Sequence, residues 1–430
     1  MKNRITLVFA ILLLVSQSLL AQQTPAAAQS QAILITGAKA YLANGKVIEN
    51  SVIAFDNGKL TIVGDANTKI DRSQYQVIDA TGKNIYPGFI ATNTRLGLVE
   101  IDAVGATNDA REFGTLNPSM RAIIAYNTDS RITPTIRSNG ILMAQVVPSG
   151  GTISGQSSVV QLDAWNWEDA AFQLDQGMHL HWPRMFSYRG WRSEPGGVAV
   201  DKNYKKNVQK IEDLFNEALA YGKNKNHKER NLKLEALSNL FTGQCKLFVH
   251  TNNVKTITES VLFAKQYNIN VVIVGGRDAW MVPDFLKENK VPVVLREVHN
   301  IPSNEDAAVD EVYKTPLTLQ NAGVDFCFSM NGSWQQRNLP FQAGSAIAYG
   351  LSYEDAVDAL TINAAKILGI DQQVGSLEMG KDATLFICAG DALDMRTCKV
   401  EKAFIQGREI DLDNKQKALY RKFKTKYGQK

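Results

Sequence analysis

The sequence predicts an α/β fold in which a TIM (β/α)8-type barrel carries a small composite β-sandwich domain formed from both ends of the chain. Three observations predict it. Strand-like and helix-like segments alternate through the middle of the chain, as is typical of parallel βα units. Short apolar runs separated by turn signals precede that region and return after it. The length of 430 residues accommodates a barrel and one smaller domain.

The N-terminal residues have the pattern of a secretory signal peptide. Two basic residues precede an apolar run from Ile5 to Val15, and Ala21 is a small residue suited to cleavage. The run is shorter than the about 20 residues that a membrane-spanning helix needs. We therefore expect residues 1–21 to be removed, residues 22–31 to form a linker, and the protein to be periplasmic or secreted. An uncleaved anchor is the alternative.

Residues 32–86 are predicted to form the first part of the β-sandwich. Asn-Gly pairs at residues 44–45 and 57–58 favour tight hairpin turns, so the flanking runs are expected to be antiparallel strands. Residues 374–411 repeat this pattern after the barrel, and the two parts are expected to pair into one domain. Residues 412–430 are rich in lysine and arginine, and we expect a solvated C-terminal helix or tail there.

Residues 87–373 are predicted to form the barrel. The strands that we expect cover residues 89–90, 141–147, 247–250, 271–274, 291–295 and 325–328. The clearest helices are expected at residues 206–221, 256–267 and 353–360. Barrel enzymes place their chemistry at the C-terminal ends of the strands, so candidate site residues are expected just after each strand.

Three motifs follow one another in a recognisable order. They are Tyr86-Pro87-Gly88-Phe89-Ile90, the segment 350–369 with Asn363-Ala364-Ala365-Lys366, and the segment 374–383. In these motifs the chain resembles the amidohydrolase superfamily, in particular members similar to imidazolonepropionase and the prolidase-like enzymes. The resemblance implies hydrolysis of a carbon–nitrogen bond in a small cyclic amide or a dipeptide, with zinc activating the water molecule.

The metal ligands that the resemblance implies are mostly replaced. The family typically uses two histidines from the first strand, one each from the fifth and sixth, and an aspartate from the eighth. His250 matches the fifth-strand histidine, but Asn93 and Arg95 stand at the first-strand positions. The sixth strand ends in Gly275-Gly276, and Ser329 to Asn331 contain no aspartate. A permanently charged guanidinium also repels a divalent ion. We expect no cofactor, or zinc if the family activity is retained.

Other residues leave alternatives open. Glu297 and His299 follow the seventh strand at positions i and i+2, so they could complete a metal site with His250, or form only a hydrogen-bonded cluster. His250, Arg95 and Asn93 are the candidate catalytic residues. Arg95 could also anchor a substrate carboxylate, or pair with Glu100 or Glu297.

A glycine- and hydroxyl-rich stretch, residues 148–158, follows an apolar strand. It could present backbone N–H groups to an anion, or be a plain long loop. We therefore name Ser154 and Gln156 as substrate-binding candidates, together with Arg95 and Asn331. The sequence His179-Leu180-His181 lies among aromatic residues in a segment from about 163 to 233 that has no clear pattern, and we expect it to be a packing or lid region.

Two functional hypotheses remain. One is an amidohydrolase acting on a small-molecule substrate. The other is a metal-free member that binds a small molecule, as a homo-oligomer or as the non-catalytic partner of an active relative. The net charge of +4 and the lack of a basic recognition motif argue against nucleic acid, and no membrane partner is expected after signal removal. Cys388 and Cys398 flank a turn-rich loop, and a local disulfide between them stays open.

Overall fold

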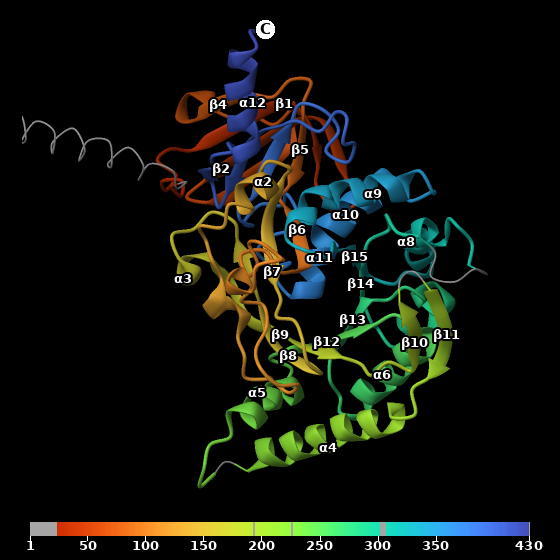
Figure 1. Cartoon of the computed structure of the whole chain (residues 1–430). Helices are drawn as coiled ribbons and strands as arrows, with labels where there is room; N and C mark the ends of the chain where they lie inside the picture. The colour runs from red at the N-terminus through yellow and green to blue at the C-terminus, as the bar shows by residue number, and fades with distance from the viewer. Residues whose placement is uncertain (1–23, 192–193, 225–226, 302–306, 430) are drawn as a thin grey trace, which may run out of the picture.

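The computed structural model describes residues 24–191, 194–224, 227–301 and 307–429 (Figure 1). The expected signal peptide lies outside these residues. No helix in the described part of the chain is both long and apolar enough to cross a membrane.

A single sheet of eight strands forms the barrel. In sheet order the strands are β6 (Phe89–Thr94), β7 (Ile141–Val146), β8 (Ile153–Gln161), β9 (Ala171–His181), β12 (Lys246–Thr251), β13 (Val271–Gly275), β14 (Val293–Leu295) and β15 (Phe326–Phe328). An isolated bridge between Thr92 and Ser329 brings the first and last strands together, and the Thr92 hydroxyl donates to the Phe328 carbonyl over 3.0 Å. The predicted barrel is confirmed, as are the strands expected in it.

One strand of the barrel runs in the opposite direction. β8 is antiparallel to both β7 and β9, whereas the other neighbours in the sheet are parallel. A loop is expected over residues 148–158, but strand β8 already begins at Ile153 within this stretch. Its polar residues can be buried because the segment before β7 covers the strand, through bridges from Leu116 to Ile153 and from Arg121 to Gln156.

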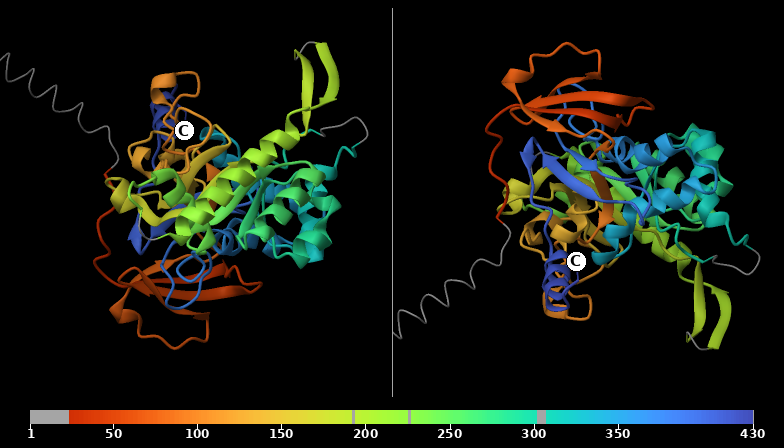
Figure 2. Two further views of the ribbon diagram at one scale, coloured as in Figure 1. Left: turned by 90° about the horizontal axis from the view of Figure 1, so that it is seen from below. Right: turned by 90° about the horizontal axis from the view of Figure 1, so that it is seen from above.

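Helices surround the parallel part of the barrel (Figure 2). They are α4 (Tyr204–Lys223), α5 (Leu232–Phe241), α6 (Val254–Gln266), α7 (Pro283–Glu288), α8 (Glu311–Ala322), α9 (Leu339–Ile347), α10 (Tyr353–Leu360) and α11 (Ile362–Leu368). The three helices expected from sequence are α4, α6 and α10. Residues of α11 join the apolar cluster inside the barrel, where Ile367 and Leu368 pack with Phe248 and Val274. Smaller elements are α2 (Thr133–Arg137), α3 (Trp167–Ala170) and the hairpin β10 (Phe186–Trp191) and β11 (Glu194–Val200).

The second sheet is built from both ends of the chain. Its strands are β1 (Ile33–Tyr41), β2 (Val47–Asp56), β3 (Lys59–Asp65), β4 (Gln76–Asp79), β5 (Asn84–Pro87), β16 (Leu385–Cys388), β17 (Val400–Ile405) and β18 (Arg408–Glu409). β5 and β16 pair antiparallel and so join the two ends into one continuous mixed sheet. The last helix, α12 (Lys415–Lys426), follows this sheet.

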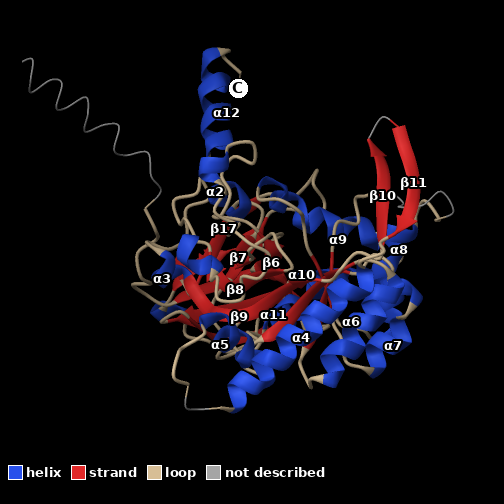
Figure 3. Ribbon diagram, turned by 60° about the horizontal axis from the view of Figure 1, so that its bottom comes forward, coloured by secondary structure: helices blue, strands red, loops and turns tan. Residues whose placement is uncertain are grey.

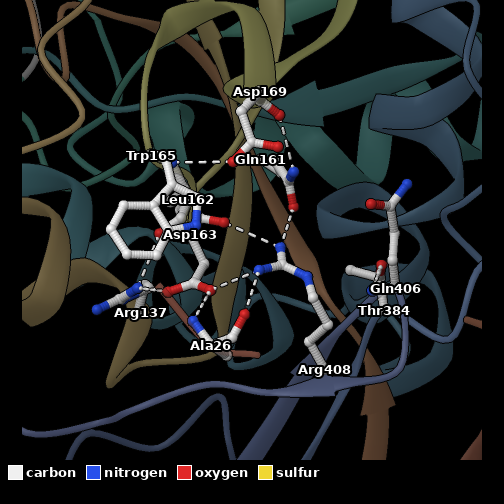
Figure 4. Close-up of polar contacts among 10 residues, drawn as sticks. All are labelled: Ala26, Arg137, Gln161, Leu162, Asp163, Trp165, Asp169, Thr384, Gln406 and Arg408. Atoms are coloured by element: carbon white, nitrogen blue, oxygen red, sulfur yellow. Dashed lines mark hydrogen bonds and ion pairs between the residues drawn. The ribbon is translucent and has the colours of Figure 1, made fainter. Parts of the chain in front are cut away.

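A buried ion-pair network joins this sheet to the barrel (Figure 4). The Asp163 carboxylate, which follows β8, accepts from Arg137 of α2 at 2.5 Å and from Arg408 of β18 at 2.9 Å. It also accepts from the Ala26 N–H at 2.9 Å. Arg408 donates in addition to the Gln161 side chain at 2.6 Å. One carboxylate therefore holds both ends of the chain against the barrel.

The local disulfide that the sequence leaves open is not formed in this structure, where Cys388 and Cys398 are free thiols. A hydrogen bond from the Cys398 thiol lowers the pKa of Cys388 to about 7. Whether the pair oxidises stays a prediction.

Candidate functional site

Three histidines meet inside the barrel, near its C-terminal opening. Neighbouring parallel strands bring them there, because His179 lies opposite Phe248 and His181 lies opposite His250. Side chains at i and i+2 of a strand share one face, so both histidines of β9 point the same way. His179 Nδ1 lies 2.9 Å from His250 Nε2, and the rings of His181 and His250 stack with centroids 4.2 Å apart.

The expectation that His179-Leu180-His181 belongs to a packing or lid region is wrong, because these residues end a barrel strand. The signal was present in the sequence as a period of two. Met178, Leu180 and Trp182 pack in the main core, while His179 stacks on Phe248 at 5.0 Å in the barrel interior. This period of two does not by itself indicate a barrel strand, because a helix is expected between consecutive barrel strands and the antiparallel strand β8 is not.

A chain of hydrogen bonds continues from these histidines into the barrel. Ser157 of β8 lies 2.8 Å from His179 Nε2, and it accepts from the amides of Gln145 and Gln176. The Gln145 oxygen accepts from the Asn93 N–H, which fixes the orientation of that amide. The Ser157 hydroxyl has one proton and two acceptors within reach, the Gly177 carbonyl at 3.3 Å and His179 Nε2 at 2.8 Å, and the shorter contact favours donation to His179.

The shorter Ser157 contact favours one set of histidine tautomers. When His179 Nε2 accepts from Ser157, the proton of that ring is on Nδ1 and is donated to His250 Nε2, and His250 carries its own proton on Nδ1. In the opposite tautomers His250 Nε2 is the donor to His179 Nδ1. In both cases His250 Nε2 is engaged with His179 at 2.9 Å and is not directed to a ligand or a metal ion.

All three histidines are neutral at neutral pH. Burial, with a smaller effect of the nearby His181, lowers the pKa of His179 to about 3. Burial lowers the pKa of His250 well below its usual value, and the neighbouring histidines and Arg296 add to this. Burial and the charge of Arg184 lower the pKa of His181. The cluster is thus a set of uncharged bases, two of which are linked to each other.

His181 and His250 form part of the wall of a cleft of about 830 Å³ at the ends of β9, β12, β13 and β14. We call it the mouth cleft. Its lining includes the apolar side chains of Trp182, Pro183, Met185 and Phe186. It also includes Arg184, Arg277 and Arg296, with Asp278 as the acidic residue in the lining. A cleft of this size fits a small organic molecule.

One atom in this wall has an unmet hydrogen-bonding capacity. His181 Nε2 is buried and has no hydrogen-bond partner among the described residues. A buried polar atom without a partner costs about 1–3 kcal/mol. His181 is also one of the residues that line the mouth cleft.

The first-strand positions differ from the expectation in geometry as well as in residue type. Asn93 has a positive φ of 51° at an irregularity between β6 and β7. Side chains therefore do not alternate regularly between the two faces of the strand here. The rule that residues i and i+2 share a face does not apply to Asn93 and Arg95. Arg95 pairs weakly with Asp102, at 4.0 Å, and not with the expected Glu100 or Glu297.

The alternative metal set is not brought together. The Glu297 carboxylate accepts from the Asn331 N–H and lies 3.7 Å from Arg296. His299 turns to α9, where its Nε2 hydrogen-bonds to the Ser345 hydroxyl and its N–H donates to Gln342. The two side chains diverge because the strand has ended at Leu295, so the strand alternation assumed for them does not apply.

The two candidates in the glycine-rich stretch face away from the cleft. The Ser154 hydroxyl donates to the Gly150 carbonyl, and the Gln156 amide donates to the Pro118 carbonyl, on the outer face of β8. The N–H groups of Ser149 and Thr152 are donated to the carbonyls of Ala110 and Thr115. These N–H groups are therefore unavailable to an anion, whereas Ser157 of β8 does reach the barrel interior, beside His179.

The residues present do not fit the family's metal. Within the described ranges, no group of three or more His, Cys, Asp and Glu side chains is placed to hold a metal ion. Zinc needs three protein ligands with available lone pairs. Here one histidine nitrogen is occupied by its neighbour, and the first strand supplies an amide and a guanidinium.

Comparison with known proteins identifies relatives across most of the chain. A model of the amidohydrolase family matches residues 219–410. An imidazolonepropionase from Rhizobium rhizogenes is 24% identical over 387 residues, covering 80% of this chain and 88% of the relative. An amidohydrolase from Thermotoga maritima MSB8 superposes with a TM-score of 0.75 at 23% identity, covering 88% of this chain and 99% of that one. A prolidase solved with N-methylphosphonate-L-proline superposes with a TM-score of 0.53 at 15% identity, covering 89% and 100%.

Proposed function

The chain belongs to the amidohydrolase superfamily, and on that premise we propose that it is a member that works without a bound metal and binds a small organic anion in the mouth cleft. The superfamily comprises hydrolases of carbon–nitrogen bonds. What distinguishes this member is the replacement of the residues that would hold its metal.

The hydrogen bond between His179 and His250 carries the proposal. Its length of 2.9 Å is that of a well-formed N–H···N contact. A metal at His250 Nε2 would have to break it and strip the buried His179 of its partner. Arg95 adds a fixed positive charge beside the first strand, where a divalent ion would be repelled. Both features oppose a metal in this part of the barrel.

The arginines of the mouth cleft set the ligand class. Arg277 is held by Asp278 at 3.0 Å, and Arg296 by Glu297 at 3.7 Å, so both side chains are oriented. Planar guanidinium groups bind carboxylate and phosphate oxygens through paired hydrogen bonds. The apolar wall from Trp182 to Phe186 suits the carbon skeleton of such a ligand. We therefore favour a small carboxylate with an apolar or ring-shaped body.

Two measurements test this function. Protein purified after growth with added zinc should hold well below one equivalent of metal per chain. Calorimetric titration with small carboxylates should show binding that Arg296→Gln weakens about ten- to hundredfold, because a hydrogen bond to a charged group is worth about 1.5–3 kcal/mol. Lys69→Gln, which removes an exposed cation of the other sheet, is the matched control. Stoichiometric zinc that is lost in His250→Ala would overturn the metal-free assignment.

A second candidate is retained hydrolysis of a carbon–nitrogen bond, and one observation favours it. The neutral His181 has an unpartnered Nε2 at the mouth cleft, so it could take a proton from an attacking water molecule. Turnover of an imidazolone carboxylate or of a dipeptide ending in proline should then fall sharply in His181→Gln with KM little changed. Turnover that His181→Gln leaves intact would exclude this role.

Export and partnership remain predictions. We propose a periplasmic or secreted protein because of the N-terminal pattern around Ile5 to Val15 and Ala21. A homo-oligomer, or pairing with an active relative, is consistent with a metal-free member. Light scattering and co-purification would distinguish these states.

A further inference from the structure

The C-terminal helix α12 lies apart from both sheets. It projects from the body of the molecule, with the C-terminus at its tip (Figure 3). None of its residues is buried. It also follows the residues that the amidohydrolase family model matches, which end at 410. A helix that neither closes the barrel nor completes the sheet needs another explanation for its sequence.

The charges of α12 are of one sign. Its twelve residues include six lysines and arginines and no acidic residue. They are Lys415, Lys417, Arg421, Lys422, Lys424 and Lys426, of which Arg421 forms an ion pair with Asp413, just before the helix. For comparison, the whole chain has a net charge of only +4. The positive charge is therefore concentrated on this one projecting element.

Between these charges runs an apolar stripe. Leu419, Phe423 and Tyr427 follow one another at i, i+4 and i+8 on one face, with Tyr420 beside them. The exposed fraction is 41% for Leu419, 44% for Phe423, 65% for Tyr427 and 63% for Tyr420. Lysine side chains border the stripe, since the amines of Lys424 and Lys426 lie 5.8 and 5.3 Å from the rings of Tyr420 and Tyr427. Aromatic groups flanked by lysines are typical of helices that lie in a membrane interface.

The first turn fixes how the helix is presented. Asn414 caps it by accepting from the Lys417 N–H at 2.9 Å and donates to Ser138 at 2.9 Å. Gln416 accepts from Thr135 of α2 at 2.8 Å. The stripe is thus held on a defined side of the protein.

We propose that α12 docks the protein on a membrane surface that contains anionic phospholipids. The cationic border would contact the headgroups, while Leu419, Phe423 and the tyrosines would enter the interface. A second copy is a poorer partner for this face, because two helices of six positive charges would repel each other. Nucleic acid would use the charges but would leave the apolar stripe without a role. The exposed stripe is the reason to depart from the expectation of a solvated tail with no membrane partner.

Flotation with lipid vesicles tests the proposal on the full chain from residue 22. The protein should float with vesicles of phosphatidylcholine mixed with phosphatidylglycerol and should stay below pure phosphatidylcholine vesicles. Lys422→Gln with Lys424→Gln should weaken binding about 25-fold, since each surface lysine contributes about fivefold. Lys46→Gln with Lys69→Gln has the same change in charge on exposed residues elsewhere and should float like the parent.

A second variant separates the stripe from the charges. Leu419→Ser with Phe423→Ser keeps every lysine and should reduce flotation at least about tenfold, because two partly buried apolar groups are lost from the interface. Unfolding midpoints should be unchanged, since neither side chain is buried in the protein. Four results would each overturn the proposal. Two of them are equal binding to both vesicle types and no binding to either type. The other two are a dimer that is lost in the serine variant and duplex DNA binding that the serine variant retains.

Discussion

Asp163→Asn is the substitution with the clearest expected effect on stability. The change keeps the shape of the side chain and removes the negative charge that Arg137 and Arg408 share (Figure 4). The side chain of Asp163 is 3% exposed, and those of the two arginines are 5% and 15% exposed. Water therefore cannot replace the lost carboxylate around either guanidinium group.

Removing one partner of a buried ion pair costs about 3–5 kcal/mol, because the other charge remains buried without compensation. Two guanidinium groups lose the carboxylate that they share here, which raises the cost, although Arg137 keeps its hydrogen bond to the Leu162 carbonyl. Arg408 keeps hydrogen bonds to the Gln161 side chain and the Asp163 carbonyl, and the new amide oxygen can accept one more, which lowers it. We expect the free energy of unfolding to fall by about 3–5 kcal/mol.

Urea unfolding, followed by circular dichroism and tryptophan fluorescence, measures this loss. Asp102→Asn is the matched control, because Asp102 is 67% exposed and lies 4.0 Å from Arg95. The control should change stability by less than about 0.5 kcal/mol. In a double-mutant cycle, Asp163→Asn with Arg408→Gln should cost less than the sum of the two changes. A loss below about 1 kcal/mol for Asp163→Asn would refute the reasoning.

Three further predictions concern the barrel interior. Burial holds the pKa of His179 at about 3, so the unfolded chain takes up a proton on this residue near pH 6.5 while the folded chain does not. His179 should therefore contribute a fall in stability of about 1.4 kcal/mol per pH unit as the pH decreases through this window, in addition to the contributions of His250 and His181. Urea unfolding at several pH values should show a slope that is shallower by about this amount for His179→Gln. Ser157→Ala removes the hydroxyl beside His179 Nε2 and should cost about 1–3 kcal/mol, with Ser30→Ala, at an exposed serine, as the milder control. Gly177→Ala would place a methyl group 2.5 Å from the Phe248 ring and should cost about 1–3 kcal/mol in the thermal or urea transition, and an unchanged midpoint would contradict the packing described.

The parallel part of the barrel was predictable because its strands are continuous apolar runs. Val271 to Val274 and Val291 to Leu295 have the composition of strands buried on both faces. The helices α4, α6 and α10 show the apolar spacing of amphipathic helices. In these segments the local pattern and the final packing agree.

β8 was missed because its residues do not have the composition of a strand. Gln156, Ser157 and Ser158 are suitable only because other parts of the chain supply their partners. These are the carbonyls of Met120 and Pro118 for Gln156, His179 for Ser157 and Asp175 for Ser158. Such long-range compensation cannot be seen in a local window. The misplacement of β8 also hid the true position of the β9 histidines.

The candidate site was only partly accessible for the same reason. His250 was found because it ends an apolar strand of the expected kind. The arginines at 184, 277 and 296 have no local signal, because their grouping depends on the ends of β9, β13 and β14 meeting around one cleft. His299 was misjudged because the rule of alternating faces was applied beyond the end of a strand.

The pairing of β5 with β16 has a consequence for how the chain must fold. Asn84 and Gly390, which hydrogen-bond across this joint, are 306 positions apart. During synthesis β5 therefore stays an open edge until almost the whole chain has been made, and an exposed edge can pair with other chains. Contacts of such high contact order form late and slowly. We expect nascent chains shorter than about residue 390 to depend on chaperones, although most of their barrel is already complete.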